Sequence, residues 1–170
     1  MIVRKLDIED LPTRVKWMNN PRIYSSMHYE IPILLEKTQE WFYNNQYKDN
    51  RLDVVICDSS DNNSIVAFAG FVGVDTVIGK AETYLFVDPD RIGEGLGSKA
   101  KSLMIDYAFN VLQLNKLYVI TNEDNYSSIR IQEKFGYKLE GRFREEYKSV
   151  DGSLKDRLYY GLLKKDWVDE

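Results

Sequence analysis

The stretch from Tyr84 to Lys99 most constrains what this chain can fold into, because it predicts three kinds of structure in direct succession. Its first four residues are aromatic or apolar and end at Asp-Pro, a pattern that favours a β-strand. Apolar residues recur at helical spacing from Leu96 to Leu112, which predicts a long amphipathic helix. Between the two, a loop is predicted by three glycines at alternate positions, Gly93, Gly95 and Gly97.

A glycine-rich turn that opens a helix can hold phosphate. Glycine lets backbone N–H groups approach an anion closely, and the N–H groups of a first helical turn have no partner within the helix. The spacing G-x-G-x-G differs from the G-x-G-x-x-G of dinucleotide-binding folds, and Gly97-Ser98-Lys99 has the wrong order for a nucleoside-triphosphate loop. The loop alone therefore indicates a phosphorylated cofactor without naming it, and a plain turn that packs a helix is the alternative.

The composition narrows the class of protein. A chain of 170 residues that is 44% hydrophobic and 29% charged is expected to form one globular domain. A net charge of −4 disfavours nucleic-acid binding, which requires a basic face. One cysteine, Cys57, and one histidine, His28, exclude an intrachain disulfide and make a metal site or a histidine-based triad improbable.

No apolar run approaches the roughly 20 residues of a membrane span. The first residues, Met-Ile-Val-Arg-Lys-Leu-Asp, also lack the apolar core of a signal peptide. We therefore expect no membrane association and a cytoplasmic location.

Hydrophobic periodicity predicts a mixed order of helices and strands along the chain. Two helices follow a short first strand, one capped by Asp7 and one that begins after Pro32. A short apolar strand at Leu117 to Ile120 is expected to lie centrally and parallel to a neighbour. Further strands are predicted at 52–57, 65–74, 84–87, 137–147 and 157–163.

A second motif supplies the missing identity of the ligand. Asn125-Tyr-Ser-Ser-Ile-Arg-Ile-Gln-Glu-Lys-Phe-Gly-Tyr137 resembles the Asn-x-x-Ser/Ala-Ile…Lys-x-Gly-Phe/Tyr signature of the GNAT superfamily of acetyl-CoA-dependent N-acetyltransferases. The glycine loop stands upstream of it, where that family has its pyrophosphate loop. The chain looks most similar to the spermidine acetyltransferases and the acetyltransferases of ribosomal-protein N-termini.

The resemblance implies an α/β fold (α+β mixed), with a single GNAT-like domain over residues 1–170. Its mixed central sheet would have about seven strands, splayed at the cofactor site and flanked by about four helices. Acetyl-CoA would be the cosubstrate, and no metal would be needed. The resemblance implies these cofactor-binding residues: Leu85, Phe86, Val87, Ile92, Gly93, Glu94, Gly95, Leu96, Gly97, Ser98, Asn125, Ser128 and Lys134.

The implied reaction is direct attack of an amine on the acetyl thioester, which needs a base to deprotonate the amine and a donor for the thiolate. Glu82 is the expected base, and Glu145 or Glu146 is the second choice. Many relatives place a tyrosine where this chain has Gln132, which cannot serve as an acid. We therefore expect Ser128 to donate the proton to the leaving thiolate. Another tyrosine or water could donate it instead, or the thiolate could leave without a proton donor.

Two further residue sets concern the binding of the cofactor phosphates and of the acceptor amine. Ile92 stands where many relatives carry glutamine or arginine, a departure that affects one of the family's phosphate contacts. The expected acceptor is a small primary amine such as a polyamine or an amino sugar. Aromatic and acidic residues can receive such a cation, and the expected substrate-binding residues are Tyr29, Glu30, Glu82 and Tyr147.

Two alternatives stay open at this point. One is an acetyltransferase that acts on protein N-termini, and the other is a regulatory module that binds acyl-CoA with little turnover. A nucleotide-binding regulatory protein is a third reading of the glycine loop. The sequence also leaves open whether the protein forms a homodimer or a higher homo-oligomer.

Overall fold

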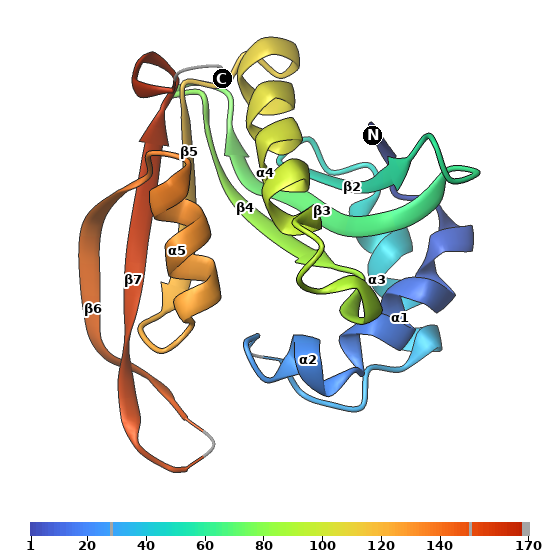
Figure 1. Cartoon of the computed structure of the whole chain (residues 1–170), viewed down its shortest axis with the longest axis horizontal. Helices are drawn as coiled ribbons and strands as arrows, with labels where there is room; N and C mark the ends of the chain where they lie inside the picture. The colour runs from blue at the N-terminus through green and yellow to red at the C-terminus, as the bar shows by residue number, and fades with distance from the viewer. Residues whose placement is uncertain (28, 150, 168–170) are drawn as a thin grey trace. The chain divides into compact units, whose positions relative to one another are not determined.

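The structure is a computed structural model that describes residues 1–27, 29–149 and 151–167. It contains a seven-stranded sheet with the strand order β1-β2-β3-β4-β5-β7-β6 (Figure 1). The predicted number of strands is therefore confirmed. The strands are β1 (Ile2–Lys5), β2 (Arg51–Asp58), β3 (Ser64–Asp75), β4 (Lys80–Val87), β5 (Lys116–Asn122), β6 (Lys138–Lys148) and β7 (Leu154–Leu163).

Five α-helices occur in the described part of the chain, one more than the sequence predicts. The additional one is the single turn α2, which Asn20 caps by accepting a hydrogen bond from the Arg22 N–H. The sequence pattern there is irregular because one helical turn has no room for an apolar period. The helices are α1 (Leu11–Met18), α2 (Pro21–Tyr24), α3 (Leu35–Asn45), α4 (Leu96–Asp106) and α5 (Tyr126–Lys134).

The chain divides into two compact units. Unit 1 comprises Met1–Val72 with Tyr84–Leu103, and unit 2 comprises Gly73–Thr83 with Met104–Glu170. We describe each unit by itself, and the single domain over residues 1–170 stays a prediction.

Unit 1 is built on the antiparallel pairs β1–β2 and β2–β3. Its core gathers side chains from α1, α2, β2, β3 and β4 around Phe68, which is fully buried. Gly70 faces the ring of Tyr84, and a Cβ on Gly70 would clash with Tyr84 Cε1. Glycine at position 70 therefore makes room for this ring. The β2–β3 ladder has a shift of register between Ile56 and Cys57.

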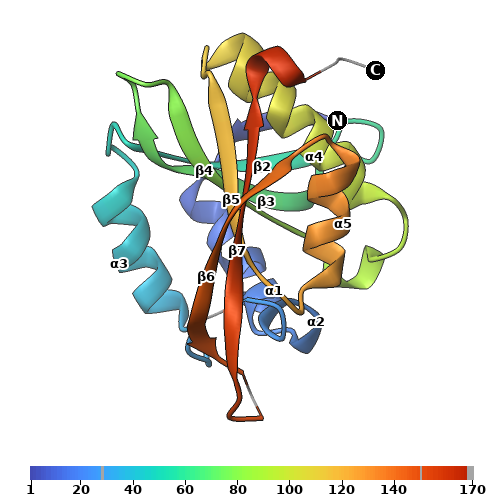
Figure 2. The ribbon, with the colours of Figure 1, turned by 90° about the vertical axis from the view of Figure 1, so that its left-hand side faces the viewer.

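Unit 2 is built on β5, which pairs in parallel with the first residues of β4 and antiparallel with β7. The predicted central, parallel strand is thereby confirmed. β6 and β7 form a long twisted hairpin, and α5 lies alongside β5 and β7 (Figure 2). The helix packs on the sheet through Tyr160, whose hydroxyl donates to Glu133 at 3.3 Å.

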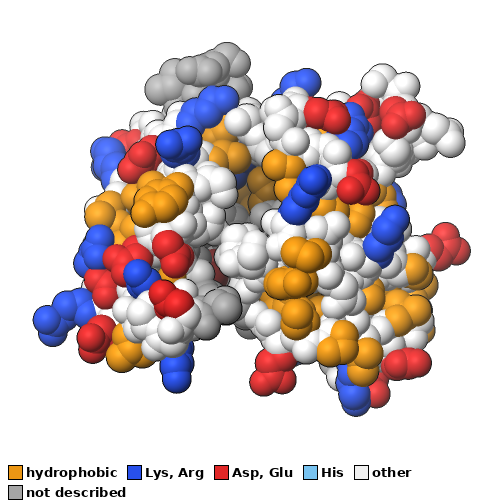
Figure 3. Space-filling view, turned by 60° about the horizontal axis from the view of Figure 1, so that its bottom comes forward, with side chains coloured by type: hydrophobic (Ala, Val, Ile, Leu, Met, Phe, Trp, Pro, Cys, Tyr) orange, Lys and Arg blue, Asp and Glu red, His pale blue; other side chains and the backbone are white. Residues whose placement is uncertain are grey.

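Acidic and basic side chains are interspersed over the face that Figure 3 presents. This mixture agrees with the small net charge of −4. No helix in the described residues has both the length and the apolar character that crossing a bilayer requires.

Candidate active site

The predicted strand, loop and helix from Tyr84 to Lys99 are confirmed in unit 1. β4 ends at Val87, a 3₁₀ turn covers Pro89–Arg91, and α4 begins at Leu96. Gly93 has φ +102° and Gly95 has φ +76°, which is left-handed backbone that side chains disfavour. A Cβ on either glycine would meet nothing within 4 Å. These glycines are therefore required by backbone conformation and leave open space above the loop.

The loop presents backbone donors without acceptors. In residues 1–27, 29–149 and 151–167, the N–H groups of Gly93, Gly95, Leu96 and Gly97 donate to no protein acceptor. Such a row of N–H groups at a helix N-terminus matches the oxygens of a pyrophosphate. The geometry of the loop therefore fits the cofactor that the sequence predicts.

Three contacts within unit 1 anchor the loop. The Asp88 N–H donates to the Val66 carbonyl of β3 at 3.0 Å. The Arg22 guanidinium donates to the Pro89 carbonyl at 2.9 Å, and Arg91 pairs with Glu94 at 2.9 Å. Glu94 is thereby turned toward Arg91, and its charge is compensated there.

β4 extends beyond its pairing with β5. The parallel ladder joins Lys80 to Glu82 with Lys116 to Tyr118, and Tyr84 to Val87 lie past its end. The Phe86 side chain is buried in the core of unit 1, so only its backbone is available to a cofactor. Leu85 and Val87, whose side chains point to the opposite face, are partly exposed.

In unit 2, Glu82 lies among aromatic side chains. Tyr118 and Tyr159 stack with ring centroids 4.8 Å apart and an interplanar angle of 11°. Burial raises the pKa of Glu82 above its ordinary value, while the positive charge of Arg157 opposes the shift. A carboxylate with a raised pKa is a better base near neutral pH than a solvated one.

The second-choice bases sit in a different environment. Glu145 and Glu146 are exposed on β6, and the Glu145 N–H donates to Asp156 at 2.9 Å. Both side chains are exposed, so neither has the partly buried environment that distinguishes Glu82.

Asn125 caps α5, as predicted. Its side-chain oxygen accepts a hydrogen bond from the Ser128 N–H at 3.1 Å. Ser128 is partly exposed, Lys134 is exposed, and the Lys134 ammonium lies 5.6 Å from the ring centre of Phe135.

Gln132 is on the same face of α5 as Ser128, one turn further along. It is only 4% exposed, and its side-chain oxygen Oε1 finds no hydrogen-bond partner among the residues that the structure describes. An amide in this place offers an acceptor where many relatives have a phenol.

The predicted substrate-binding residues fall in both units. In unit 1, the Tyr29 hydroxyl donates to the Met18 carbonyl at 2.8 Å and Glu30 is exposed. Burial raises the pKa of Tyr29 to about 12, and Arg14 opposes the shift. In unit 2, the Tyr147 hydroxyl donates to Asp124 at 2.6 Å, and the ring is buried.

The predicted site residues thus form two sets. Unit 1 holds Tyr29, Glu30, Leu85, Phe86, Val87 and the loop residues Ile92 to Ser98. Unit 2 holds Glu82, Asn125, Ser128, Lys134 and Tyr147. Their binding and catalytic roles remain predictions.

Sequence reasoning missed the stacked pair of Tyr118 and Tyr159 and the buried Arg14. The aromatic pair carries a weak signal, since both tyrosines lie in predicted strands. Arg14 occupies the inner position between Leu11 and Trp17 of α1, so helical spacing marks it as a buried charge.

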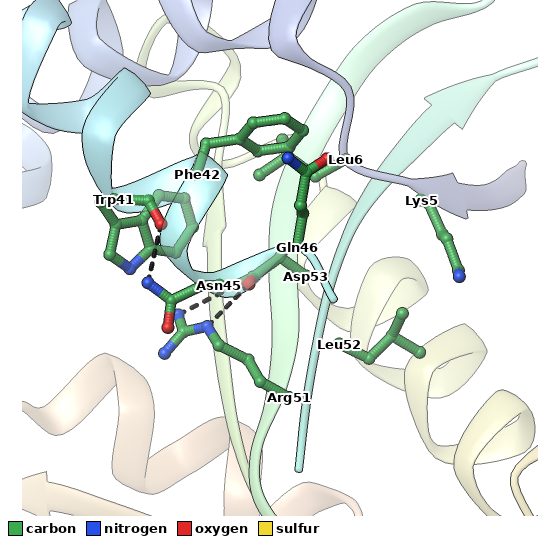
Figure 4. A pocket seen from close by; sticks show the side chains of 9 residues that line it. All are labelled: Lys5, Leu6, Trp41, Phe42, Asn45, Gln46, Arg51, Leu52 and Asp53. Atoms are coloured by element: carbon green, nitrogen blue, oxygen red, sulfur yellow. Dashed lines mark hydrogen bonds and ion pairs between the residues drawn. The ribbon is translucent and has the colours of Figure 1, made fainter. Parts of the chain in front are cut away.

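A small cavity of unit 1 lies beside α3 and β2 (Figure 4). Its volume is about 40 Å³, which is too small for an acyl donor. Arg51 on its wall pairs with Asp53 at 2.7 Å. No cluster of three or more potential metal ligands occurs among the described residues.

Comparison with known proteins decides the family. Residues 1–138 match the model of the acetyltransferase (GNAT) domain. The chain belongs to this family. As a GNAT protein, it is an acetyl-CoA-dependent N-acetyltransferase with the family's mixed α/β fold.

Curated relatives and solved structures agree with this assignment. The chain is 28% identical to the spermidine N(1)-acetyltransferase of Escherichia coli (strain K12), over 99% of this chain and 88% of the relative. It is 30% identical to the putative ribosomal N-acetyltransferase YdaF of Bacillus subtilis (strain 168), over 64% of this chain and 59% of the relative.

The structural comparison shows the same fold. The spermidine N-acetyltransferase of Vibrio cholerae, solved in complex with CoA and spermine, superposes with a TM-score of 0.89 at 21% identity. The match covers 99% of this GNAT chain and 98% of the other.

Proposed function

We propose that this GNAT protein transfers the acetyl group of acetyl-CoA to a small primary amine by direct attack, without a covalent enzyme intermediate. The observation that carries the proposal is the loop after β4, with left-handed Gly93 and Gly95 and with N–H groups of Leu96 and Gly97 that have no acceptor among the described residues. The names of the relatives make a polyamine the first acceptor to test, and an amino sugar is the second.

Acetyl-CoA supplies an activated acyl group as a thioester, and the chain's own residues hold it. Backbone N–H groups from Ile92 to Ser98 bind the pyrophosphate. The backbone of Leu85, Phe86 and Val87, which lies past the β4–β5 ladder, bonds to the pantetheine arm. Asn125, Ser128 and Lys134 complete the cofactor site, as the family resemblance implies.

Glu82 accepts the proton of the attacking amine, directly or through water. A free alkylammonium has a pKa near 10, so it does not attack until a base removes its proton. Burial of the Glu82 carboxyl raises its pKa toward the range in which a carboxylate accepts protons. The positive charge of Arg157 opposes this rise of the Glu82 pKa.

The leaving thiolate has a different proton source from that of many relatives. Gln132 offers amide groups, which neither release nor recover a proton at neutral pH. The Ser128 hydroxyl, one helical turn away on the same face, is the proposed donor. Unassisted departure is the alternative, because a thiol has a pKa of only about 8.5.

Release of free thiol from acetyl-CoA tests the proposal across a panel of amines. The panel contains polyamines, amino sugars, amino acids and peptides with free N-termini. Amine-dependent release above the rate without amine is expected for at least one small amine. Release with peptides alone supports a protein N-terminal acetyltransferase instead. Tight CoA binding without release from any amine contradicts the proposal and supports an acyl-CoA-binding module.

We also propose that the protein works in the cytoplasm on a small-molecule substrate, without nucleic acid or membrane partners. Assembly into a homodimer or a higher homo-oligomer is measured directly by light scattering after size-exclusion chromatography.

A further inference from the structure

Glu82, Tyr118 and Tyr159 lie on one face of the sheet in unit 2. Glu82 and Tyr118 are direct partners in the parallel β4–β5 ladder. Tyr159 is two residues from Gly161, the partner of Tyr118 on β7, so its side chain is on the same face. α5 packs on the opposite face through Tyr160, and Tyr118 and Tyr159 are partly exposed. Both tyrosines therefore offer accessible surface to a ligand.

The stacked rings of Tyr118 and Tyr159 are neutral and can attract a cation. Burial raises the pKa of the Tyr118 hydroxyl, and the negative charge of Glu82 adds to the rise. Burial also raises the pKa of the Tyr159 hydroxyl, to which the charges of Glu140 and Glu82 add. Both phenols therefore stay protonated at neutral pH, and the electron-rich faces of their rings favour a positive charge.

One ammonium group of the chain already binds in this way. The Lys116 ammonium pairs with the Glu140 carboxylate, and it lies 5.6 Å from the ring centre of Tyr159. A carboxylate and a tyrosine ring thus hold one ammonium together, the first by a charge-assisted hydrogen bond and the second by cation–π attraction. Since the charges of Lys116 and Glu140 cancel, this pair adds no net charge to the face.

Glu82 and Tyr118 repeat this arrangement without a cation of the chain. Because β5 lies between β4 and β7, Tyr159 stacks on one side of the Tyr118 ring and Glu82 lies toward the other. In residues 1–27, 29–149 and 151–167, no basic side chain pairs with Glu82 and none lies over the Tyr118 ring. Arg157 opposes the raised pKa of Glu82, but its guanidinium lies over the ring of Tyr147 at 5.8 Å. The place between Glu82 and Tyr118 is therefore suited to an ammonium from outside the chain.

We propose that Tyr118, stacked on Tyr159, holds the reacting ammonium of the acceptor beside Glu82. This inference rests on the proposed function and deepens it, because it adds to the base a residue that selects cationic acceptors. The acceptor arrives as a protonated amine, R–NH₃⁺, and one N–H bond breaks as an O–H bond forms on the Glu82 carboxylate. The neutral amine R–NH₂ then attacks. An alcohol of the same shape gains no cation–π attraction and is excluded.

Isothermal titration in the presence of CoA, which has no acetyl group to transfer, measures binding of the acceptor without turnover. The amines are spermidine, putrescine and glucosamine, and the neutral controls are 1,4-butanediol and glucose, in which hydroxyls replace the ammonium groups. At least one amine is expected to bind the wild type at least about tenfold more tightly than either neutral control, as for a hydrogen bond to a charged group. No binding of any amine, or equal binding of amines and neutral controls, overturns the inference.

Variants assign the attraction to the ring of Tyr118. Tyr118→Leu is expected to weaken binding of the tightest amine by about fivefold or more, and Tyr118→Phe, which keeps the ring, to retain the affinity. Pentafluorophenylalanine at position 118 keeps the shape of the Phe ring without its negative face, so it should weaken binding as Leu does, even if Tyr118→Leu fails to fold. Tyr126→Leu is the matched control, because Tyr126 is 69% exposed on α5 of the same unit. Unchanged affinity with the fluorinated ring overturns the inference.

A double-variant cycle with Glu82→Gln tests whether both groups contact the same ammonium. If they do, the double variant loses less affinity than the product of the two single losses, whereas losses that simply multiply overturn the inference. The binding assay is also independent of turnover. Thiol release from no amine, together with binding that depends on the Tyr118 ring, would remove the proposed function and leave the cation site standing. Thiol release from a small amine with the same KM in wild type and Tyr118→Leu would do the reverse.

Discussion

At the scale of single residues, Glu82 shows how environment selects one carboxylate among many. The chain has 27 acidic residues, most of which water solvates on the surface. Glu82 differs because burial raises its pKa, while the side chains of Glu145 and Glu146 are exposed. The sequence shows that Glu82 comes shortly before Tyr84 and Phe86 of β4. It does not show that the Glu82 carboxyl is partly buried.

Glu82→Gln is expected to reduce thiol release by about 100-fold or more, the usual contribution of a general base. The acidic limb of the pH–rate profile, which reports deprotonation of the base, should also disappear. An unchanged pH–rate profile in this variant would remove Glu82 from the role. Glu82→Asp, which keeps the carboxylate, is the matched control and should retain a pH-dependent limb.

Stability offers an independent check on Glu82. Its pKa is raised in the folded state, so the fold binds the proton more tightly than the unfolded chain does. The wild type therefore loses stability as the pH rises from the unfolded pKa through the folded one. Glutamine removes this penalty, so Glu82→Gln should melt no lower than the wild type at neutral pH. A large drop in melting temperature would indicate a structural role.

At the scale of elements, the conformation of the loop between β4 and α4 depends on the residues of the loop itself. Asp88 begins the 3₁₀ turn by accepting from the Asp90 N–H, and the left-handed glycines carry the backbone to Leu96. These features depend on residues only a few positions apart. This explains why a strand, a loop and a helix can be predicted there from the sequence.

Gly95→Glu is expected to weaken CoA binding by at least about 100-fold, since it places a like charge beside the pyrophosphate and strains a left-handed residue. Isothermal titration of CoA measures the effect. Gly152→Glu is the matched control, because Gly152 has a similar φ of +84° in the turn between β6 and β7. Equal affinities in wild type and Gly95→Glu would rule out the loop as the phosphate site.

At the scale of the whole molecule, binding of CoA is expected to stabilise the folded chain. A ligand that binds only the folded chain stabilises it by about 2.7 kcal/mol at 100 times its dissociation constant. For a chain of this length each kcal/mol raises the melting temperature by about 2–4 °C. CoA should therefore raise the melting temperature measurably.

ATP and NADH at the same excess serve as controls for this thermal shift. Neither is expected to move the transition as far as CoA does. A larger shift with either nucleotide would favour the reading of a nucleotide-binding regulatory protein.

The sequence by itself determined the strand, glycine loop and helix around residues 84–99 and the capped helix at Asn125, because turns and caps depend on neighbours within a few residues. Its motifs also indicated the family and the acyl donor. Only the tertiary structure decided what surrounds Arg14 of α1, since the four aromatic rings around it belong to α3, β3 and β4: Trp41, Phe68, Tyr84 and Phe86. Helical spacing predicts that the charge of Arg14 is buried. It does not predict whether a carboxylate from a distant part of the chain pairs with it. Among the described residues, Asp53 pairs with Arg51 and accepts from the Tyr84 hydroxyl, while the Arg14 guanidinium packs against aromatic rings.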